Sequence, residues 1–470
     1  MIIFILILFI FTFVSSNYEP TWESLDNRPL PSWYDEAKFG IFMHWGVYSV
    51  PSYSSEWLWY HWKGENPDPV VVRYMNKTYS SDITYFDFAK SFTAKNFDPS
   101  NFASIVKASG ARYFVFTSKH HEGFTMWPSK TSFGWNSVDI GPKKDIVKEL
   151  KYAIEKENIT FGLYFSLMDW FHPLFLKDIK DNTTFFRDQI SYPQLIEIVN
   201  EYHPKIIWSD GEWSKDDVYW RSKEFLTYLY NDSPVKDDVV VNDRWGTGDI
   251  GHHGGFMTYS DNYDPGIMIN KKWENCMTLD RKSWGYRRDI NSNDIYTVEE
   301  VIDSLVRTIS CNGNFLLNIG PDSNGRISPI FEERLRDLGL WVNDNSEAIF
   351  NTIPWIHQSD SIDNTTWYTY KKLSMPKMIH FKRQNVNTVY AFILQIPDNL
   401  IIHLNKYEVK NISSIKVSIL GATKFIPKVY VKPLKRGIFI DINGLNYKFL
   451  IKSHGKIVLK IKLRNNINNM

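Results

Sequence analysis

The chain of 470 residues contains very little cysteine, with only Cys276 and Cys311. So few cysteines exclude a small disulfide-stapled scaffold, and the sequence does not decide whether the two form a pair. Net charge is also nearly absent, because 54 Lys and Arg residues balance 53 Asp and Glu residues and leave a formal charge of +1. This balance gives no electrostatic basis for binding nucleic acid or an anionic membrane surface.

Long apolar runs are confined to the N-terminus. Residues 2–14 are almost entirely apolar and are followed by the small residues Ser15 and Ser16. The run is too short to span a bilayer, and polar sequence follows it. We therefore expect residues 1–16 to be a cleaved signal peptide, with no membrane span in the mature chain. This predicts a protein of the secretory pathway, either lysosomal or secreted.

Six Asn-X-Ser/Thr sequons are consistent with that route and predict N-glycosylation. Asn231 is the least favoured acceptor, because Pro234 follows the Ser233 of its sequon. The six candidate acceptors are Asn76, Asn158, Asn182, Asn231, Asn364 and Asn411.

No glycine-rich phosphate fingerprint opens a predicted helix, which disfavours an open doubly wound sheet. Instead, short β-branched and aromatic runs alternate with amphipathic helical patterns through residues 39–321. About eight such units predict a (β/α)8-like barrel. The expected strands are Phe39–Trp45, Tyr113–Ser118, Phe161–Leu167, Lys205–Trp208, Val239–Asn242, Phe256–Ser260, one within 273–286, and Phe315–Ile319.

The pattern changes after Pro354. Alternating runs such as Val389–Leu394 and Ile415–Leu420 are separated by turn signals such as Asn443-Gly444. Such spacing is typical of an antiparallel β-sandwich. We therefore expect a catalytic α/β domain over residues 17–354 and an accessory β-sandwich domain over residues 355–470.

Aromatic residues are abundant, at 16% of the chain, and include 18 tryptophans. One informative group lies in Trp208-Ser209-Asp210-Gly211, where a carboxylate ends an apolar strand. In an α/β barrel the carboxyl end of a strand is where catalytic groups lie. A neighbouring indole suits a sugar, whose C–H face stacks on an aromatic ring. The alternative is an ordinary Asp-Gly turn.

Chemically capable side chains recur at the ends of the other predicted strands and in the loops that follow. They are His44, Glu56, Trp57, His120, His121, Tyr164 and Arg244. Imidazoles and carboxylates could form a metal hydrolase site, but the His-X-His spacing is absent. His120 and His121 point to one site only if the strand has already become a loop. Glycoside hydrolysis by two carboxylates uses these residue types without a metal or cofactor.

The stretch Pro265 to Cys276 carries the most specific motif. It closely resembles the Pro-x-x-Leu-x-x-x-Lys-Trp-Glu-x-Cys signature of the α-L-fucosidases of glycoside hydrolase family 29, including Trp273. Met268 replaces the usual Leu, a volume-conserving change. The residues around His44, His120–His121, Asp210, Arg244 and Trp284 are also similar to the family's, and the resemblance spans roughly residues 20–460.

The resemblance implies a retaining exo-glycosidase that acts on fucosylated glycans of glycoproteins and glycolipids, without a cofactor. It implies that Asp210 is the nucleophile and that Trp284 packs near the C5 methyl group of fucose. Family members often form oligomers, so a homo-oligomer is an option. The alternatives are an inactive fucose-binding lectin on the same barrel and a metal-dependent barrel hydrolase. The implied fucose subsite comprises His44, Glu56, Trp57, His120, His121, Tyr164, Trp208, Arg244 and Trp284.

Three carboxylates downstream of the nucleophile are candidates for the general acid/base. Asp261 is favoured because it follows a predicted strand, in a loop with access to a leaving group. Glu274 is the second candidate, fixed by the signature but placed within a strand, and Asp264 is a third. A retaining pair requires carboxyl groups about 5–5.5 Å apart. Cys276 is expected to be a buried structural thiol.

Overall fold

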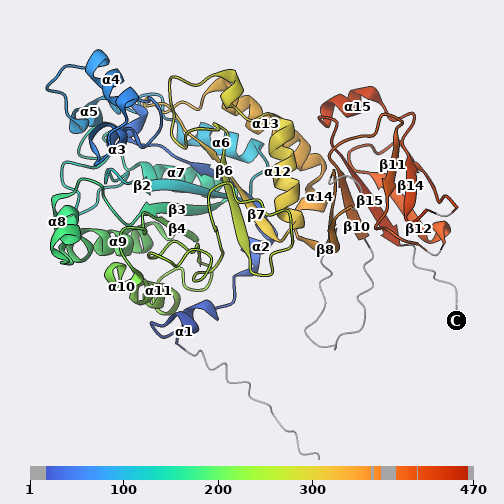
Figure 1. Ribbon diagram of the computed structural model, residues 1–470, viewed down its shortest axis with the longest axis horizontal. Coiled ribbons are helices and arrows are strands. Elements are labelled where there is room, and N and C mark those ends of the chain that lie inside the picture. Colours follow the sequence, from blue (N-terminus) through green and yellow to red (C-terminus); the bar gives the residue numbers. More distant parts are fainter. Residues whose placement is uncertain (1–16, 361–364, 372–387, 410, 434, 464–470) are drawn as a thin grey trace, which may run out of the picture.

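The computed structural model describes residues 17–360, 365–371, 388–409, 411–433 and 435–463. The predicted signal peptide at 1–16 and the sequon asparagine Asn364 lie outside the described residues. An α/β part and a smaller antiparallel β part lie beside one another, with helices between them (Figure 1). No helix among the described residues is long and apolar enough to cross a membrane.

The α/β part contains a curled sheet of seven parallel strands in the order β5-β4-β3-β2-β1-β7-β6. This confirms the predicted barrel-like α/β class. Most expected strands are found within one or two residues of their predicted bounds. The strands are β1 (Phe39–Met43), β2 (Tyr113–Lys119), β3 (Thr160–Ser166), β4 (Ile206–Asp210), β5 (Val240–Val241), β6 (Trp273–Thr278) and β7 (Gly313–Ile319).

The expected strand Phe256–Ser260 is reduced to one bridge, in which Met257 pairs with Trp273. The Phe256 N–H donates to the Val241 carbonyl (3.0 Å) and the Met257 N–H donates to the Lys272 carbonyl (2.9 Å). These bonds link the two edge strands β5 and β6. The segment stops pairing because Tyr259 takes a left-handed conformation (φ 57°), which no strand accommodates.

Helices cover the outside of this sheet, and several begin at side-chain N-caps that satisfy free backbone N–H groups. Asp98, Asp145 and Thr297 cap α6, α7 and α12 respectively. The helices are α1 (Trp22–Asp26), α2 (Ser32–Ala37), α3 (Leu58–Lys63), α4 (Pro69–Thr78), α5 (Phe88–Ser91), α6 (Pro99–Ala108), α7 (Ile146–Lys156), α8 (Pro173–Asp181), α9 (Tyr192–Tyr202), α10 (Asp217–Trp220), α11 (Ser222–Asn231), α12 (Val298–Ser310), α13 (Pro329–Asp344) and α14 (Ser346–Ile349).

The strands divide their side chains between two cores, as their alternation requires. On β2, Tyr113 and Val115 belong to a small cluster inside the curled sheet, together with Phe42 and Trp208. Phe114, the residue between them, belongs to the larger cluster beneath the helices. Side chains that face inward near the ends of the strands therefore converge at one end of the barrel.

The C-terminal part contains a five-stranded antiparallel sheet, β12-β15-β10-β9-β8, and a three-stranded sheet, β11-β14-β13. A second hydrophobic core lies between them and includes Ile393 from one sheet and Ile440 from the other. This arrangement confirms the predicted sandwich. The elements are β8 (Thr352–Ser359), β9 (Thr366–Lys371), β10 (Thr388–Ile393), β11 (Ile401–Leu404), β12 (Ile415–Ile419), β13 (Lys428–Tyr430), β14 (Ile438–Asp441), α15 (Tyr447–Lys452) and β15 (Ile457–Leu463).

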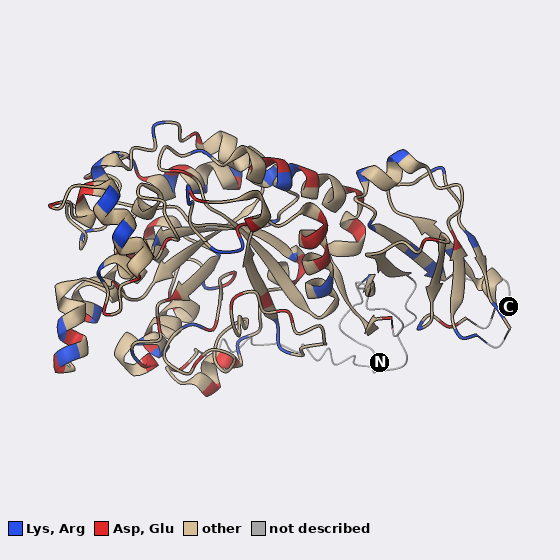
Figure 2. Cartoon of the chain, turned by 45° about the horizontal axis from the view of Figure 1, so that its top comes forward, with Lys and Arg blue, Asp and Glu red and all other residues tan. Residues whose placement is uncertain are grey.

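The two parts are packed together through one buried contact and one partly exposed ion pair. The indole N–H of Trp341 on α13 donates to the Lys456 carbonyl (2.9 Å), and His454 pairs with Glu299 of α12 (2.9 Å). Figure 2 shows acidic and basic residues interspersed over the surface helices and loops of the α/β part. This distribution agrees with the near-zero net charge of the chain.

Candidate active site

Asp210 ends β4 and faces the interior of the barrel. Ile206 and Trp208 lie in the inner cluster, and Asp210, two residues further on, is on the same face of the strand. The chain then leaves through Gly211 at φ 74°, where a Cβ atom would lie 2.8 Å from the Ser166 Oγ. Both the positive φ and the close contact favour glycine. The chain can therefore turn away sharply after Asp210, which leaves this carboxylate at the mouth of the barrel.

Asp210 opens onto a cavity of about 110 Å³. The nine predicted fucose-binding residues all contribute to its wall, as does Asp261. The implied fucose subsite did not include two further lining residues, Phe42 and Trp213. Trp213 follows Asp210 by three residues, and its place in an aromatic loop after a strand end was an available signal. The wall consists of Phe42, His44, Glu56, Trp57, His120, His121, Tyr164, Trp208, Asp210, Trp213, Arg244, Asp261 and Trp284.

Three cavity residues hold the Asp210 carboxylate. The Tyr164 hydroxyl donates to Oδ2 (2.7 Å), the Arg244 guanidinium donates to Oδ1 (3.0 Å), and His121 Nε2 lies 3.5 Å from Oδ2. Burial, followed by the charge of Asp210, raises the pKa of Tyr164 well above its usual value, so the phenol remains a donor. These contacts fix the orientation of the Asp210 carboxylate in the cavity.

Arg244 joins Asp210 to a second carboxylate. One terminal nitrogen binds Asp210, and the other donates to Asp261 Oδ1 (2.5 Å). The Nε atom donates to Thr258 Oγ1 (3.2 Å), and the Thr258 hydroxyl in turn donates to Asp243 Oδ1 (2.6 Å). Burial alone would lower the pKa of Arg244, but the Asp261 and Asp210 charges raise it well above its usual value. The guanidinium is therefore a permanent positive charge between two carboxylates.

The three candidate acids lie in different environments. The Asp261 side chain is 43% exposed and lies at the cavity wall. Glu274 is 1% exposed inside the barrel, where it accepts bonds from Tyr34 and Tyr113 (both 2.7 Å) and from the Trp208 indole (3.0 Å). Burial raises the pKa of Glu274. Glu274 does not line the cavity described above.

Asp264, the third candidate, forms an ion pair with Arg307 of α12. Its side chain is 14% exposed, and it is not among the residues that line the cavity. The structure therefore brings only Asp261 of the three acids into the cavity with Asp210.

Two histidines of the cavity, His44 and His121, each have a neutral hydrogen-bond partner at Nδ1. His44 Nδ1 bonds to the Asn318 side-chain oxygen (2.8 Å), and His121 Nδ1 bonds to Ser166 Oγ (2.7 Å). Because β2 ends at Lys119, His120 and His121 both lie in the following loop and reach the same cavity. Burial, followed by the nearby His120, lowers the pKa of His44 to about 3. His44 is therefore neutral across the physiological range.

Glu56 and Trp284 form a further part of the cavity wall. One oxygen of Glu56, Oε2, accepts bonds from the Trp284 N–H (2.9 Å), the Gly285 N–H (3.0 Å) and the Ser283 hydroxyl (3.0 Å). The Trp284 ring lies 5.3 Å from the His44 ring. The wall thus combines the Trp284 indole with a carboxylate whose hydrogen bonds from the described residues all go to Oε2.

Trp273 and Cys276, the other predicted residues of the signature, are buried and do not line the cavity. The Trp273 indole donates to the Cys311 carbonyl (2.9 Å) beneath the sheet. Cys276 is buried, with its Sγ 3.8 Å from Asp261 Oδ1. Cys276 and Cys311 are both free thiols, so they do not pair with one another.

The described sequon asparagines differ in accessibility. Asn231 is half-buried, and its side-chain amide binds both the N–H and the carbonyl of Tyr18 (2.9 and 2.8 Å). A glycan on that nitrogen would disrupt the pairing. The exposed ones are Asn76, Asn158, Asn182 and Asn411.

The metal alternative has no support from the described part of the chain, which contains no group of three His, Cys, Asp or Glu side chains placed to hold a metal ion. What it contains is a buried carboxylate, a second carboxylate at the cavity wall, and indole rings around both. At the carboxyl end of a parallel barrel, this combination defines the class of carbohydrate-hydrolysing enzymes.

Comparisons with known proteins narrow the class to one family. The family model described as α-L-fucosidase matches residues 11–347. The tissue α-L-fucosidase of Mus musculus is 48% identical over 407 residues, covering 86% of each chain. The plasma α-L-fucosidase of Homo sapiens is 48% identical over 436 residues, covering 92% of this chain and 88% of that one. The chain belongs to the α-L-fucosidase family of glycoside hydrolases.

A solved structure supports the same assignment. The crystal structure of an α-fucosidase from Thermotoga maritima superposes with a TM-score of 0.77 at 30% sequence identity, and covers 94% of this chain and 99% of that chain. The likeness therefore extends over the catalytic part and the C-terminal sandwich together.

Proposed function

We propose that this enzyme removes terminal α-L-fucose from glycoprotein and glycolipid glycans by a retaining double displacement. The observation that carries the proposal is the single Arg244 guanidinium that binds Asp210 with one nitrogen and Asp261 with another. Two carboxylates facing one small cavity are the minimal requirement for this chemistry.

In the first step an Asp210 oxygen attacks the anomeric carbon of fucose. The bond between that carbon and the leaving oxygen breaks, and Asp261 gives its proton to the leaving oxygen. In the second step water attacks the same carbon and gives a proton to Asp261. The ester bond to Asp210 breaks, which restores both groups and the original anomeric configuration.

Asp261 suits the acid/base role better than Glu274 because of their environments. Glu274 is enclosed by three donors within the barrel, whereas the half-exposed Asp261 lies at the cavity wall. An acid that serves a leaving group needs access to bulky aglycones from solvent. Glu274 remains the second candidate.

The rest of the cavity suits one fucose ring. We assign its hydroxyl groups to the neutral and charged partners His44, Glu56, His120 and His121, and its C–H faces to the Trp57 and Trp208 rings. Tyr164 and Arg244 serve Asp210. Trp284 is placed near the C5 methyl group, where an indole favours a 6-deoxy sugar over one with a 6-hydroxyl group.

We further propose that residues 1–16 are removed on entry to the secretory pathway and that the mature enzyme is lysosomal or secreted. The proposed domains are residues 17–354 and 355–470. The four exposed sequon asparagines are the proposed glycan acceptors. The relatives named above are tissue and plasma enzymes, which agrees with such a route. Assembly into a homo-oligomer is compatible with the proposal but not required by it.

Hydrolysis of 4-nitrophenyl α-L-fucopyranoside by the wild type and by Asp210→Gly tests the proposal. We expect turnover by the wild type and a loss of at least about 10³-fold in kcat for the variant, because the variant lacks the carboxylate that attacks the anomeric carbon. Asp264→Asn is the control, since it alters a nearby carboxylate outside the cavity. Proton NMR of the first-formed fucose should show the α anomer.

A wild type that is folded and binds fucose but shows no turnover would refute the hydrolase proposal and support the lectin alternative. Release of the β anomer would rule out double displacement. Full activity in Asp210→Gly would show that Asp210 is only a turn residue.

A further inference from the structure

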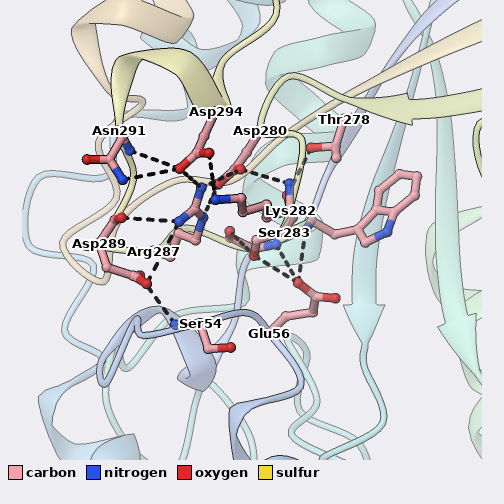
Figure 3. A network of polar contacts seen from close by, with 12 residues as sticks. Ser54, Glu56, Thr278, Asp280, Lys282, Ser283, Arg287, Asp289, Asn291 and Asp294 are labelled. Carbon is pink, nitrogen blue, oxygen red and sulfur yellow. Dashed lines mark hydrogen bonds and ion pairs between the residues drawn. The ribbon is translucent and has the colours of Figure 1, made fainter. Parts of the chain in front are cut away.

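The loop between β6 and α12 is organised by one buried arginine, Arg287, whose side chain is only 3% exposed. Its Nε and one terminal nitrogen bind the two oxygens of Asp280 (2.6 and 2.9 Å), and the same terminal nitrogen binds Asp294 Oδ2 (2.8 Å). The other terminal nitrogen donates to the Asp289 carbonyl (3.2 Å). We call Arg287, Asp280 and Asp294 the arginine clasp (Figure 3).

The clasp ties the two ends of the loop together. Asp280 lies two residues after β6, and Asp294 ends the short helix η4 (Ser292–Asp294). Burial raises the pKa of Asp280, so the carboxylate depends on its arginine partner to remain charged. The planar guanidinium can bind both aspartates at once, which an ammonium group cannot do with the same geometry.

The segment that the clasp encloses carries groups of the proposed sugar site. Trp284 is a wall of the cavity, and its N–H and that of Gly285 donate to Glu56 Oε2. The Trp284 carbonyl accepts a bond from Asn318 (2.7 Å), whose oxygen holds His44 (2.8 Å). One loop conformation therefore sets the positions of an indole, a carboxylate and an imidazole.

The same loop is attached to the segment that carries Glu56. The Arg288 N–H donates to the Ser52 carbonyl (2.7 Å), and its guanidinium donates to the Val50 carbonyl (2.8 Å). The Ser54 N–H donates to Asp289 Oδ1 (3.3 Å). A shift of the loop would therefore move both sides of the wall.

We propose that Arg287 is a positioning residue for sugar recognition, and this inference rests on the proposed function. Arg287 is not among the residues that line the cavity. It acts by fixing the loop that aligns Trp284 and holds one oxygen of Glu56, which leaves the other oxygen of that carboxylate for a sugar hydroxyl. The recognised feature is the 6-deoxy face of the sugar and its neighbouring hydroxyl group.

Arg287→Lys tests the inference, because lysine keeps the charge but cannot bridge both aspartates. The matched control is Arg281→Lys. Arg281 lies at the start of the same loop, is 34% exposed, and pairs with Glu300 on α12. Both variants are assayed with the 4-nitrophenyl glycosides of α-L-fucose and of α-L-galactose, which differ only by the 6-hydroxyl group.

For Arg287→Lys we expect kcat/KM for the fucoside to fall at least tenfold, mainly through KM, and preference for the fucoside over the galactoside to fall at least threefold. Arg281→Lys should stay within twofold of the wild type. In a Glu56→Ala background, Arg287→Lys should cost clearly less than it costs in the wild type, because one of the two groups that it positions is already gone.

Unchanged preference and KM in Arg287→Lys, or losses that multiply fully with Glu56→Ala, would overturn the inference and leave Arg287 as a stabilising residue only. If Arg287→Lys does not fold, Asp294→Asn provides the same comparison with a smaller change. A wild type that hydrolyses neither glycoside would refute the proposed function and this inference together, whereas normal wild-type kinetics with a normal Arg287→Lys would refute only the inference.

Discussion

At the scale of single residues, the local surroundings of the carboxylates distinguish chemistry from structure. Asp261→Asn should reduce kcat/KM at least about 10²-fold for a natural fucosyl linkage but much less for an aryl fucoside, whose leaving group needs little protonation. Glu274→Gln should instead lower the melting temperature, because a buried amide cannot accept all three bonds made to the carboxylate. Kinetics with both substrates and thermal melting of both variants would check this.

The reverse result would reassign the acid/base. If Glu274→Gln showed the dependence on leaving group and Asp261→Asn did not, Glu274 would be the proton donor. The control Asp264→Asn should change neither measurement.

A second prediction at the residue scale concerns the effect of His44 on how stability depends on pH. Its pKa is about 3 when folded, against an ordinary value near 6.5, so between these values the unfolded chain binds more protons. Stability should therefore rise with pH across this window, and at pH 4.5 the neutral burial of His44 costs about 3 kcal/mol. The difference in unfolding free energy between pH 7.5 and pH 4.5 should shrink by this amount in His44→Gln, as urea titrations would measure. An unchanged pH dependence would contradict the assignment.

Sequence reasoning at this scale located the cavity residues but not what holds them. His44, Asp210 and Trp284 follow recognisable motifs, so they could be named in advance. Asn318 and Ser166, which orient the histidines, come from other strands. Their role depends on how neighbouring strands are aligned, and polar residues at strand ends are too common to predict it.

At the scale of elements, a close approach between two helices makes Gly339 in α13 irreplaceable. A Cβ atom at this position would lie 1.7 Å from the Ala108 carbonyl oxygen at the end of α6. Gly339→Ala should therefore destabilise the protein by at least about 2 kcal/mol, despite the better helix propensity of alanine. Leu340→Ala, at the exposed neighbouring position, should stay within about 0.5 kcal/mol. Thermal unfolding of both variants provides the test, and equal melting temperatures would argue against the contact.

Strand prediction succeeded where burial on both faces gave continuous apolar runs, as in Tyr113–Lys119. It failed at Phe256–Ser260, where a similar composition forms only one bridged pair. An apolar composition indicates that a segment is buried, and most of this segment is. Composition does not indicate the left-handed backbone conformation at Tyr259. That turn directs the chain toward Asp261, so the irregularity serves the site.

At the scale of the whole molecule, the α/β part and the C-terminal sandwich should unfold together. Trp341 and Phe392 belong to one buried cluster that includes residues of both domains. Trp341→Ala should lower stability by about 3 kcal/mol or more and should affect both domains, because it leaves a cavity at their junction. Trp213→Ala, at the exposed cavity mouth, should alter activity without such a loss. Loss of activity and loss of circular dichroism should follow one transition, and two separate transitions would contradict a shared core.

The free cysteines have a consequence for how the protein can be made and handled. Burial raises the pKa of Cys276 well above its usual value and that of Cys311 to about 12, so little reactive thiolate is present at neutral pH. No covalent crosslink between them has to form during folding, and none can be lost to a reductant. Folding is therefore expected to be indifferent to redox conditions, and a bacterial cytoplasm should yield the same native thiols as an oxidising compartment.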